Sequence, residues 1–146
     1  MPEQAVVPDA EAVLARFSEP TRAWFTGAFE APTAAQLGAW DAVSSGQNAL
    51  VVAPTGSGKT LSAFLWALDG FVREDGAEAV GADGAGQDPA DAAPRPATRV
   101  LYVSPLKALG VDVERNLRSP LIGITQTAAR LEKLHWRREG WGRVLG

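Results

Sequence analysis

The feature that most constrains this chain is the loop "APTGSGKT", residues 53–60, which joins an apolar run to an apolar helix. The run before it, "ALVVAP", is short, continuously apolar and rich in β-branched residues, as in a strand buried on both faces of a parallel sheet. Residues 60–72 after it have the pattern of a helix. A strand that leads through a glycine-rich turn into a helix predicts an α/β fold.

The loop follows the phosphate-binding P-loop pattern, with Ala53 where the strict pattern has its first glycine. Glycine lets several backbone N–H groups point at one polyphosphate, because a Cβ or an ordinary φ would block this arrangement. The helix start adds N–H groups and a positive dipole end. We expect Lys59 to contact the β- and γ-phosphates of ATP and the Thr60 hydroxyl to hold Mg²⁺, and assign both a catalytic role. The expected nucleotide-binding residues of the loop are Thr55, Gly56, Ser57, Gly58, Lys59 and Thr60. The alternative is a plain turn with a solvated lysine.

Three helices are predicted before the loop. The first covers residues 9–17, and the second covers residues 21–29 after the cap and first-turn proline of "SEP". The third begins after its cap Thr33 and ends near Ser45, where Gly46 stops it.

After the loop helix, residues 74–98 are built from Ala, Gly, Asp and Pro, with 6 acidic residues and one arginine. Such a segment buries too little apolar surface to offset its ordering entropy, so we predict a disordered insertion. Trypsin would then cut first at Arg73 or Arg95. A second strand is predicted at "RVLYVSP", residues 99–105, and helices at residues 106–119 and 120–134, with Pro120 in a first turn or at a kink.

Charge is distributed unevenly along the chain. Residues 1–98 carry 5 basic and 13 acidic side chains, whereas residues 99–146 carry 9 basic and 4 acidic ones. The basic half fits a nucleic-acid contact or an ordinary solvated helix face. The end, residues 135–146, interleaves tryptophan and arginine, which fits nucleic-acid contact or a frayed terminus. The single histidine, His135, excludes a histidine metal cluster.

Three ordered motifs resemble those of superfamily 2 helicases. "FSEPTRAWFTGAF" with "PTAAQ", then "APTGSGKT", then "VLYVSPLKALGVDVERNL" resemble the adenine-sensing glutamine motif, motif I and motif Ia. The match favours the large helicase-related (Lhr) branch of DEAD/DEAH-type enzymes and covers about residues 13–130 apart from the insertion. It implies a P-loop NTPase fold, a RecA-like helicase domain 1 with an incomplete parallel sheet flanked by helices.

The resemblance also implies site residues. Gln36 is similar to the glutamine that reads the adenine edge, a task suited to its amide. One of Phe17, Trp24 or Phe25 would stack on adenine, or all three would be core residues. The motif Ia residues Ser104, Leu106 and Lys107 would contact a nucleic-acid phosphate at a helix start, although Lys107 could also be an ordinary surface lysine.

From the resemblance we divide the chain into N-terminal helices with the glutamine motif (1–46), a partial ATP-binding domain with its insertion at 74–98 (47–130) and a divergent tail (131–146). The expected partner is single-stranded or duplex DNA or RNA. No membrane segment is expected, and the absence of cysteine fits a reducing cytoplasm. We also expect a monomer.

Several family features are absent from the sequence. It contains no Asp-Glu dipeptide to position Mg²⁺ and the attacking water, no Ser-Ala-Thr motif and no second RecA-like domain. We therefore interpret it as the N-terminal piece of an ATP-dependent helicase that couples ATP hydrolysis to strand translocation. A non-catalytic remnant with weak nucleotide or strand binding is the alternative, and a small P-loop phosphotransferase is a third hypothesis.

We predict that the 146-residue chain alone neither hydrolyses ATP appreciably nor unwinds a duplex. Hydrolysis needs an arginine that stabilises the transition state, a contact worth about 10³ to 10⁵ in rate, besides a carboxylate that orients water. The measurement is ATP turnover with and without single-stranded DNA or RNA. Multiple turnover that is stimulated by the strand and lost in Lys59→Ala would contradict this prediction.

Overall fold

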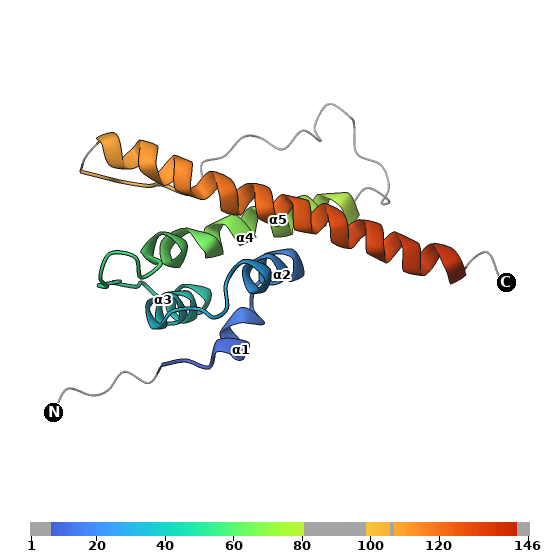
Figure 1. Cartoon of the computed structure of the whole chain (residues 1–146), viewed down its shortest axis with the longest axis horizontal. Helices are drawn as coiled ribbons and strands as arrows, with labels where there is room; N and C mark the ends of the chain where they lie inside the picture. Colours follow the sequence, from blue (N-terminus) through green and yellow to red (C-terminus); the bar gives the residue numbers. More distant parts are fainter. Residues whose placement is uncertain (1–6, 81–98, 106, 143–146) are drawn as a thin grey trace.

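The computed structural model describes residues 7–80, 99–105 and 107–142, and its regular elements are helices (Figure 1). The long helix α5 lies across α2 and α4, α3 packs against α4, and α1 packs against α3. The bounds are α1 Ala10–Leu14, α2 Glu19–Ala28, α3 Ala34–Ser44, α4 Lys59–Val80 and α5 Lys107–Gly142.

Helix α3 begins at its predicted cap Thr33, whereas Asp9, expected inside a helix over residues 9–17, is the cap of the shorter α1. Asp9 caps α1 by accepting a hydrogen bond from the Ala12 N–H at 2.9 Å. Thr33 and Gln36 form a reciprocal capping box at the start of α3, with N···O distances of 3.2 and 3.0 Å. Gly46 follows α3 with φ +77°, the left-handed conformation that commonly ends a helix.

Ser18 precedes α2, with Pro20 in the first turn as predicted, but its side chain does not cap the helix. Its hydroxyl and its N–H instead donate to Asp69, a buried carboxylate on α4. Arg73 also donates to Asp69 through Nε at 2.7 Å, and to the carbonyl oxygen of Arg16. A buried carboxylate needs such partners to offset its desolvation. The network therefore fastens the α1–α2 connection to α4.

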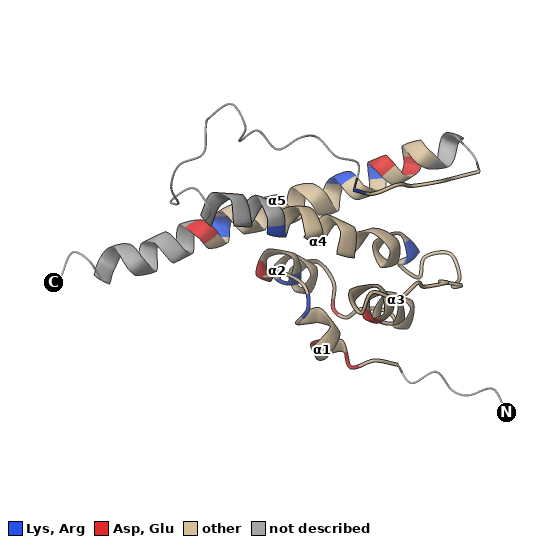
Figure 2. Ribbon diagram, turned by 180° about the vertical axis from the view of Figure 1, so that it is seen from behind, with Lys and Arg blue, Asp and Glu red and all other residues tan. Residues whose placement is uncertain are grey.

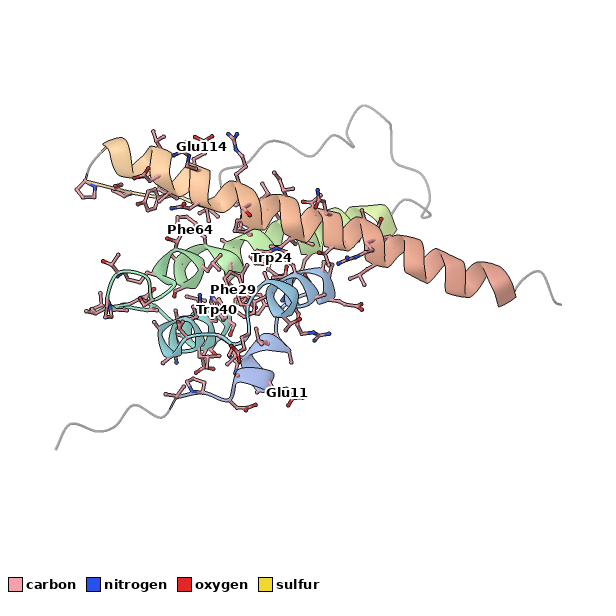
Figure 3. The ribbon with its side chains drawn as sticks, viewed as in Figure 1. Glu11, Trp24, Phe29, Trp40, Phe64 and Glu114 are labelled. Atoms are coloured by element: carbon pink, nitrogen blue, oxygen red, sulfur yellow. The ribbon has the colours of Figure 1, made fainter. Side chains whose placement is uncertain are left out.

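One hydrophobic core takes side chains from all five helices and from the α1–α2 connection. Trp40, labelled in Figure 3, is fully buried. The rings of Phe17 and Phe25 meet it edge to face at centroid distances of 5.2 and 5.4 Å. Phe17 and Phe25 are therefore core residues rather than adenine-stacking ones. The buried apolar residues of this core are Val13, Phe17, Phe25, Leu37, Trp40, Leu65 and Ile124.

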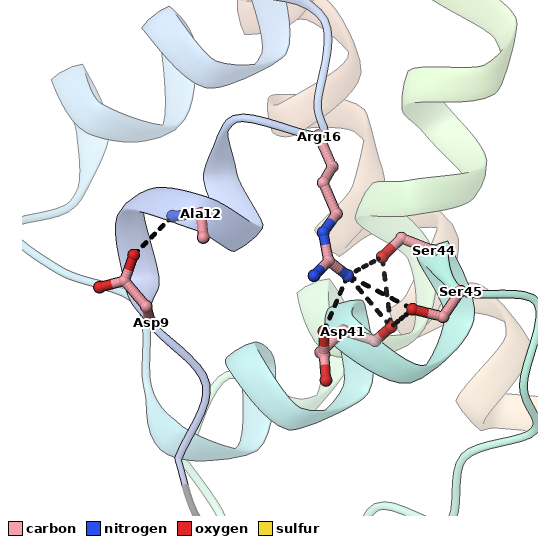
Figure 4. A network of polar contacts seen from close by, with 6 residues as sticks. All are labelled: Asp9, Ala12, Arg16, Asp41, Ser44 and Ser45. Carbon is pink, nitrogen blue, oxygen red and sulfur yellow. Dashed lines mark hydrogen bonds and ion pairs between the residues drawn. The ribbon is translucent and has the colours of Figure 1, made fainter.

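A polar cluster joins the end of α1 to the end of α3 (Figure 4). Nη1 of Arg16 lies 2.8 Å from an Asp41 carboxylate oxygen and 2.8 Å from the Ser44 hydroxyl oxygen. Both members of the ion pair are partly exposed, so the pair is worth at most about 1 kcal/mol. It fixes the orientation of α1 more than it stabilises the fold.

The two predicted strands are not strands, since none of the residues that the structure describes belongs to a β-strand. Both segments nevertheless keep a period of two in their exposure. Leu101 and Val103 are 82% and 80% exposed, whereas Val100 and Tyr102 are 41% and 45% exposed. In residues 50–53, Leu50 and Val52 are likewise far more exposed than their neighbours. The apolar side chains thus follow a strand pattern without a partner strand to hydrogen-bond.

The second of these segments runs along α4. The ring of Tyr102 lies 5.4 Å from Phe64, and the Arg99 guanidinium lies 5.9 Å from the Phe71 ring. The helix rises about 10.5 Å between Phe64 and Phe71, and an extended chain needs about 10 Å from residue 99 to residue 102. These spans match, so the segment is extended and antiparallel to α4. Contacts with a helix replace the expected sheet.

Two helices are longer than the sequence pattern predicted. α4 continues from the expected end at Val72 to Val80, into the predicted insertion, and it holds Arg73 inside the helix, which argues against early trypsin cleavage there. Residues 81–98, including Arg95, lie outside the described residues, as do residues 143–146.

α5 is one helix where two were predicted, and Pro120 lies inside it. Proline removes one backbone hydrogen bond, but burial of Ile124 beyond it holds the helix in the core. The helix also continues past its expected end at residue 134 and reaches Gly142, in the segment for which the sequence left a nucleic-acid contact or a frayed terminus open. The described helices include no apolar stretch of the length that a bilayer requires.

We predict opposite effects for two glycine-to-alanine changes in α5. At Gly123 a Cβ would lie 2.2 Å from Nε1 of Trp24 on α2, whereas at Gly110 it would meet open space. Gly123→Ala should therefore destabilise the fold by about 1 to 3 kcal/mol through overpacking, while Gly110→Ala should stabilise it by up to about 1 kcal/mol through helix propensity. The readout is the urea midpoint of the helical circular dichroism signal. Equal shifts for both variants would show that α2 and α5 do not pack closely at Gly123.

Candidate nucleotide-binding site

The loop has the backbone conformation that its glycines predict. Gly56 and Gly58 have φ +84° and +77°, and α4 begins at the next residue, Lys59. A residue with a Cβ rarely adopts such angles. The sequence therefore places its two glycines where the chain turns into the helix.

The loop is held from outside by the first turn of α3. The Thr33 hydroxyl donates to the Ser57 carbonyl oxygen at 2.9 Å, and Nε2 of Gln36 donates to the Gly58 carbonyl oxygen at 3.3 Å. Gln36 is 4% exposed. The side chains that cap α3 thus also hold the main chain of the loop, and we call these two contacts the loop clasp.

Gln36 is therefore beside the loop, as an adenine-reading residue must be. Its Oε1 accepts from the Thr33 N–H, and its Nε2 donates to Gly58. A primary amide has two donor hydrogens and two acceptor lone pairs, so each atom retains capacity for one further hydrogen bond. A role in reading adenine stays a prediction.

Several backbone N–H groups at the start of α4 are available as hydrogen-bond donors. Among the described residues, the N–H groups of Gly58, Lys59 and Thr60 have no hydrogen-bond partner. The first N–H groups of a helix have no partner within it, and with the helix dipole they favour an anion. The donor set fits the phosphates of a nucleotide.

Lys59 adds a positive charge next to these donors. Its amino group donates to the carbonyl oxygens of Ala53 and Pro54, the latter at 2.9 Å, so it lies over the loop itself. Thr60 follows in the first turn of α4 and offers a hydroxyl oxygen, the hard type of ligand that Mg²⁺ prefers. The described residues contain no cluster of three His, Cys, Asp or Glu side chains that could hold a metal ion.

The predicted nucleic-acid residues lie where an extended segment becomes a helix. Ser104 is half-buried at the end of that segment, and Lys107 is the first residue of α5. Leu106 and the Lys107 side chain lie outside the described part of the chain. Their contact with phosphate stays a prediction.

The sequence patterns did not indicate two contributors to the loop. Thr33 was predicted only as a helix cap, and Ser62 was not predicted at all, although its N–H and hydroxyl both donate to the Gly58 carbonyl oxygen at 3.1 Å. The spacing of threonine and glutamine in "TAAQ" predicts a capping box, but nothing local predicts that the box touches a loop 24 residues away.

Comparison with known families decides what this site belongs to. The profile described as DEAD/DEAH box helicase matches residues 33–138, which include the loop clasp, the loop and most of α5. The chain belongs to the DEAD/DEAH box helicase family. The resemblance found in the motifs is thereby confirmed.

Within this family the chain is similar to Lhr helicases. It is 59% identical over 117 residues to the "Lhr helicase/ probable uracil glycosylase" of Mycolicibacterium smegmatis, and 49% identical over 114 residues to the "Lhr helicase/uracil glycosylase" of Escherichia coli. These matches cover 80% and 78% of the chain but 7% of each relative. The chain thus spans a small part of the length of these relatives.

A solved structure shows the same relationship. The Mycobacterium smegmatis helicase Lhr bound to ssDNA and AMP-PNP matches with a TM-score of 0.63 and 56% sequence identity, covering 81% of this chain and 13% of that one. Family membership and this likeness imply a RecA-like P-loop fold, although the described residues of the chain itself are helical or extended without a sheet.

We predict that Gly58→Ala lowers the free energy of unfolding more than Gly56→Ala does. Both positions have positive φ, but a Cβ at Gly58 would lie 2.3 Å from Nε2 of Gln36, whereas at Gly56 it would meet open space. Gly56→Ala should cost about 1 to 2 kcal/mol of folding free energy from backbone strain. Gly58→Ala should cost about 1 to 3 kcal/mol more because of the added overpacking.

A double-mutant cycle with Gln36→Ala tests the cause. Since Gln36→Ala removes the atoms that a Cβ at position 58 would meet, the double variant should be more stable than the sum of the single effects. The same cycle with Gly56→Ala should be additive. Additivity in both cycles would show that Gln36 does not lie against Gly58.

Proposed function

We propose that this chain is the N-terminal ATP-binding part of an ATP-dependent helicase that couples ATP hydrolysis to movement along a nucleic-acid strand. The observation that carries the proposal is the loop with two positive-φ glycines that opens α4 beside Gln36, inside the range that matches the DEAD/DEAH box family. The names of the relatives, Lhr helicases and an "ATP-dependent helicase Lhr-Core", support it.

In this proposal each loop group has one role toward ATP. The N–H groups from Thr55 to Thr60 bind the phosphate oxygens, that of Ser57 after it leaves the Pro54 carbonyl oxygen to which it donates at 3.3 Å. The amino group of Lys59 moves from the loop carbonyls to the β- and γ-phosphates. The Thr60 hydroxyl ligates Mg²⁺, whose charge would stabilise the transferred phosphoryl group. Gln36 uses its remaining donor and acceptor on the adenine edge.

Ser104, Leu106 and Lys107 contact the phosphates of the strand in the same proposal. The start of α5 supports this role, because a helix N-terminus binds phosphate through its N–H groups and dipole. The related structure with ssDNA supports a single strand as partner. We propose that the chain acts on DNA or RNA as a monomer.

We predict that Lys59→Ala weakens ATP binding by about 2 to 4 kcal/mol, the scale of a desolvated charge contact. Fluorescence anisotropy of a labelled ATP measures the affinity. The fold should be retained, because Lys59 is exposed and contacts only loop carbonyls among the described residues. Arg22→Ala, the loss of an exposed cation on α2, serves as a charge control and should leave ATP affinity unchanged. Equal ATP affinity for wild type and Lys59→Ala would contradict the proposed role of the loop.

A further inference from the structure

A surface depression of about 450 Å³ lies at the contact between α2 and α5, apart from the loop. Trp24 of α2 forms one side, and Figure 3 shows it at the boundary between these helices. Gly123 of α5 allows this close approach. The lining residues are Trp24, Arg115, Arg118, Ser119, Ile122, Gly123 and Gln126.

Most residues that line the depression form a stripe along α5. Arg115, Ser119, Ile122 and Gln126 follow one another at intervals of four, three and four residues, which places them on one face of a helix. Arg118 lies one turn after Arg115. The helix carries both signs of charge (Figure 2), but the lining of the depression contains two arginines and no acidic residue.

The two arginines differ in their surroundings. Arg118 pairs with Glu114 on the same helix at 3.2 Å, and both side chains are exposed, so the pair is weak and solvated. Arg115 makes no ion pair with any described residue. Within the described part of the chain, the depression therefore offers one guanidinium without an ion-pair partner, beside the half-buried indole of Trp24, whose ring also contacts Phe25 and Phe29.

We propose that this depression binds single-stranded nucleic acid, with a base stacked on Trp24 and the adjoining phosphates held by Arg115 and Arg118. An aromatic face beside cationic side chains is the arrangement that binds single strands without sequence preference. Ser119 and Gln126 offer hydrogen-bonding groups to the base edge. The proposal rests on the proposed function and adds a contact outside Ser104, Leu106 and Lys107.

An acidic peptide is the competing partner, because it would also satisfy the arginines. It offers carboxylates but no base to stack, so it leaves the Trp24 face without a specific partner. The stacking surface thus favours a nucleic-acid strand.

The test is fluorescence anisotropy of the full 146-residue chain with two labelled strands of equal length, an oligothymidylate and an abasic phosphodiester, at several salt concentrations. Trp24→Leu should weaken oligothymidylate binding about fivefold to a hundredfold and change abasic binding much less, since stacking is lost. Arg115→Gln should weaken binding of both strands and lower the salt slope by about 0.7.

Arg130→Gln is the matched control, because it removes the same charge from an exposed position of α5 outside the depression. It should change affinity less than twofold. If Trp24→Leu loses its circular dichroism signal, Arg115→Gln decides on its own, because the residue is exposed.

The proposal is wrong if Arg115→Gln matches Arg130→Gln, if polyglutamate displaces the oligothymidylate at equal charge concentration, or if the wild-type chain binds neither strand. Lys107→Gln separates this result from the proposed function. Weaker strand binding in Lys107→Gln, together with unchanged binding in Trp24→Leu and Arg115→Gln, would overturn the depression while leaving the motif Ia contact standing. If the proposed ATP site were wrong, only the comparison of ATP affinity between wild type and Lys59→Ala would show it.

Discussion

The arrangement of this chain depends on the burial of Trp40. Its ring receives the edges of Phe17 and Phe25, and its Nε1–H donates to the Leu61 carbonyl oxygen at 3.1 Å. Gln36 lies four residues earlier, on the same face of α3, and reaches Gly58, three residues before Leu61. One stripe of α3 thus contacts both the loop and the first turn of α4. The loop clasp is thus the polar part of the contact between α3 and the segment from the loop to α4, and the hydrophobic core is the apolar part of the same contact.

The sequence was sufficient to predict the features that depend only on residues close to one another in the chain. Thr33 as a cap, Gly46 after α3 and the positive φ of Gly56 and Gly58 all follow from the conformational limits of single residues or short patterns. The two expected strands fail for the opposite reason. A short, continuously apolar run rich in β-branched residues predicts an extended chain, which residues 99–102 have along α4, but a strand also needs a ladder of hydrogen bonds with another segment.

Local sequence patterns carry no information on tertiary contacts, and this explains the remaining differences between the predicted and the observed structure. Pro120 predicted a boundary because proline removes a helix hydrogen bond, yet packing of α5 on α2 and α4 is a tertiary effect that propensity cannot include. The contact of Thr33 with the loop, across 24 residues, and that of Ser18 with Asp69, across 51 residues, likewise join positions far apart in the sequence. The backbone conformation of the loop was predictable from its own residues, whereas the side chains that contact the loop from other elements were not.

Gly58 and Gly123 are alike in one respect, because each lies under a side chain from the N-terminal helices. Gln36 covers Gly58, and Trp24 covers Gly123. The N-terminal helices therefore share one core with α4 and α5, although the sequence suggested a boundary at residue 46. A substitution in that core would alter the phosphate loop and the α2–α5 depression together. Exposed groups such as Lys59 and Arg115 can be changed without moving the core, so they are the positions at which the proposed nucleotide binding and the proposed strand binding can be measured separately.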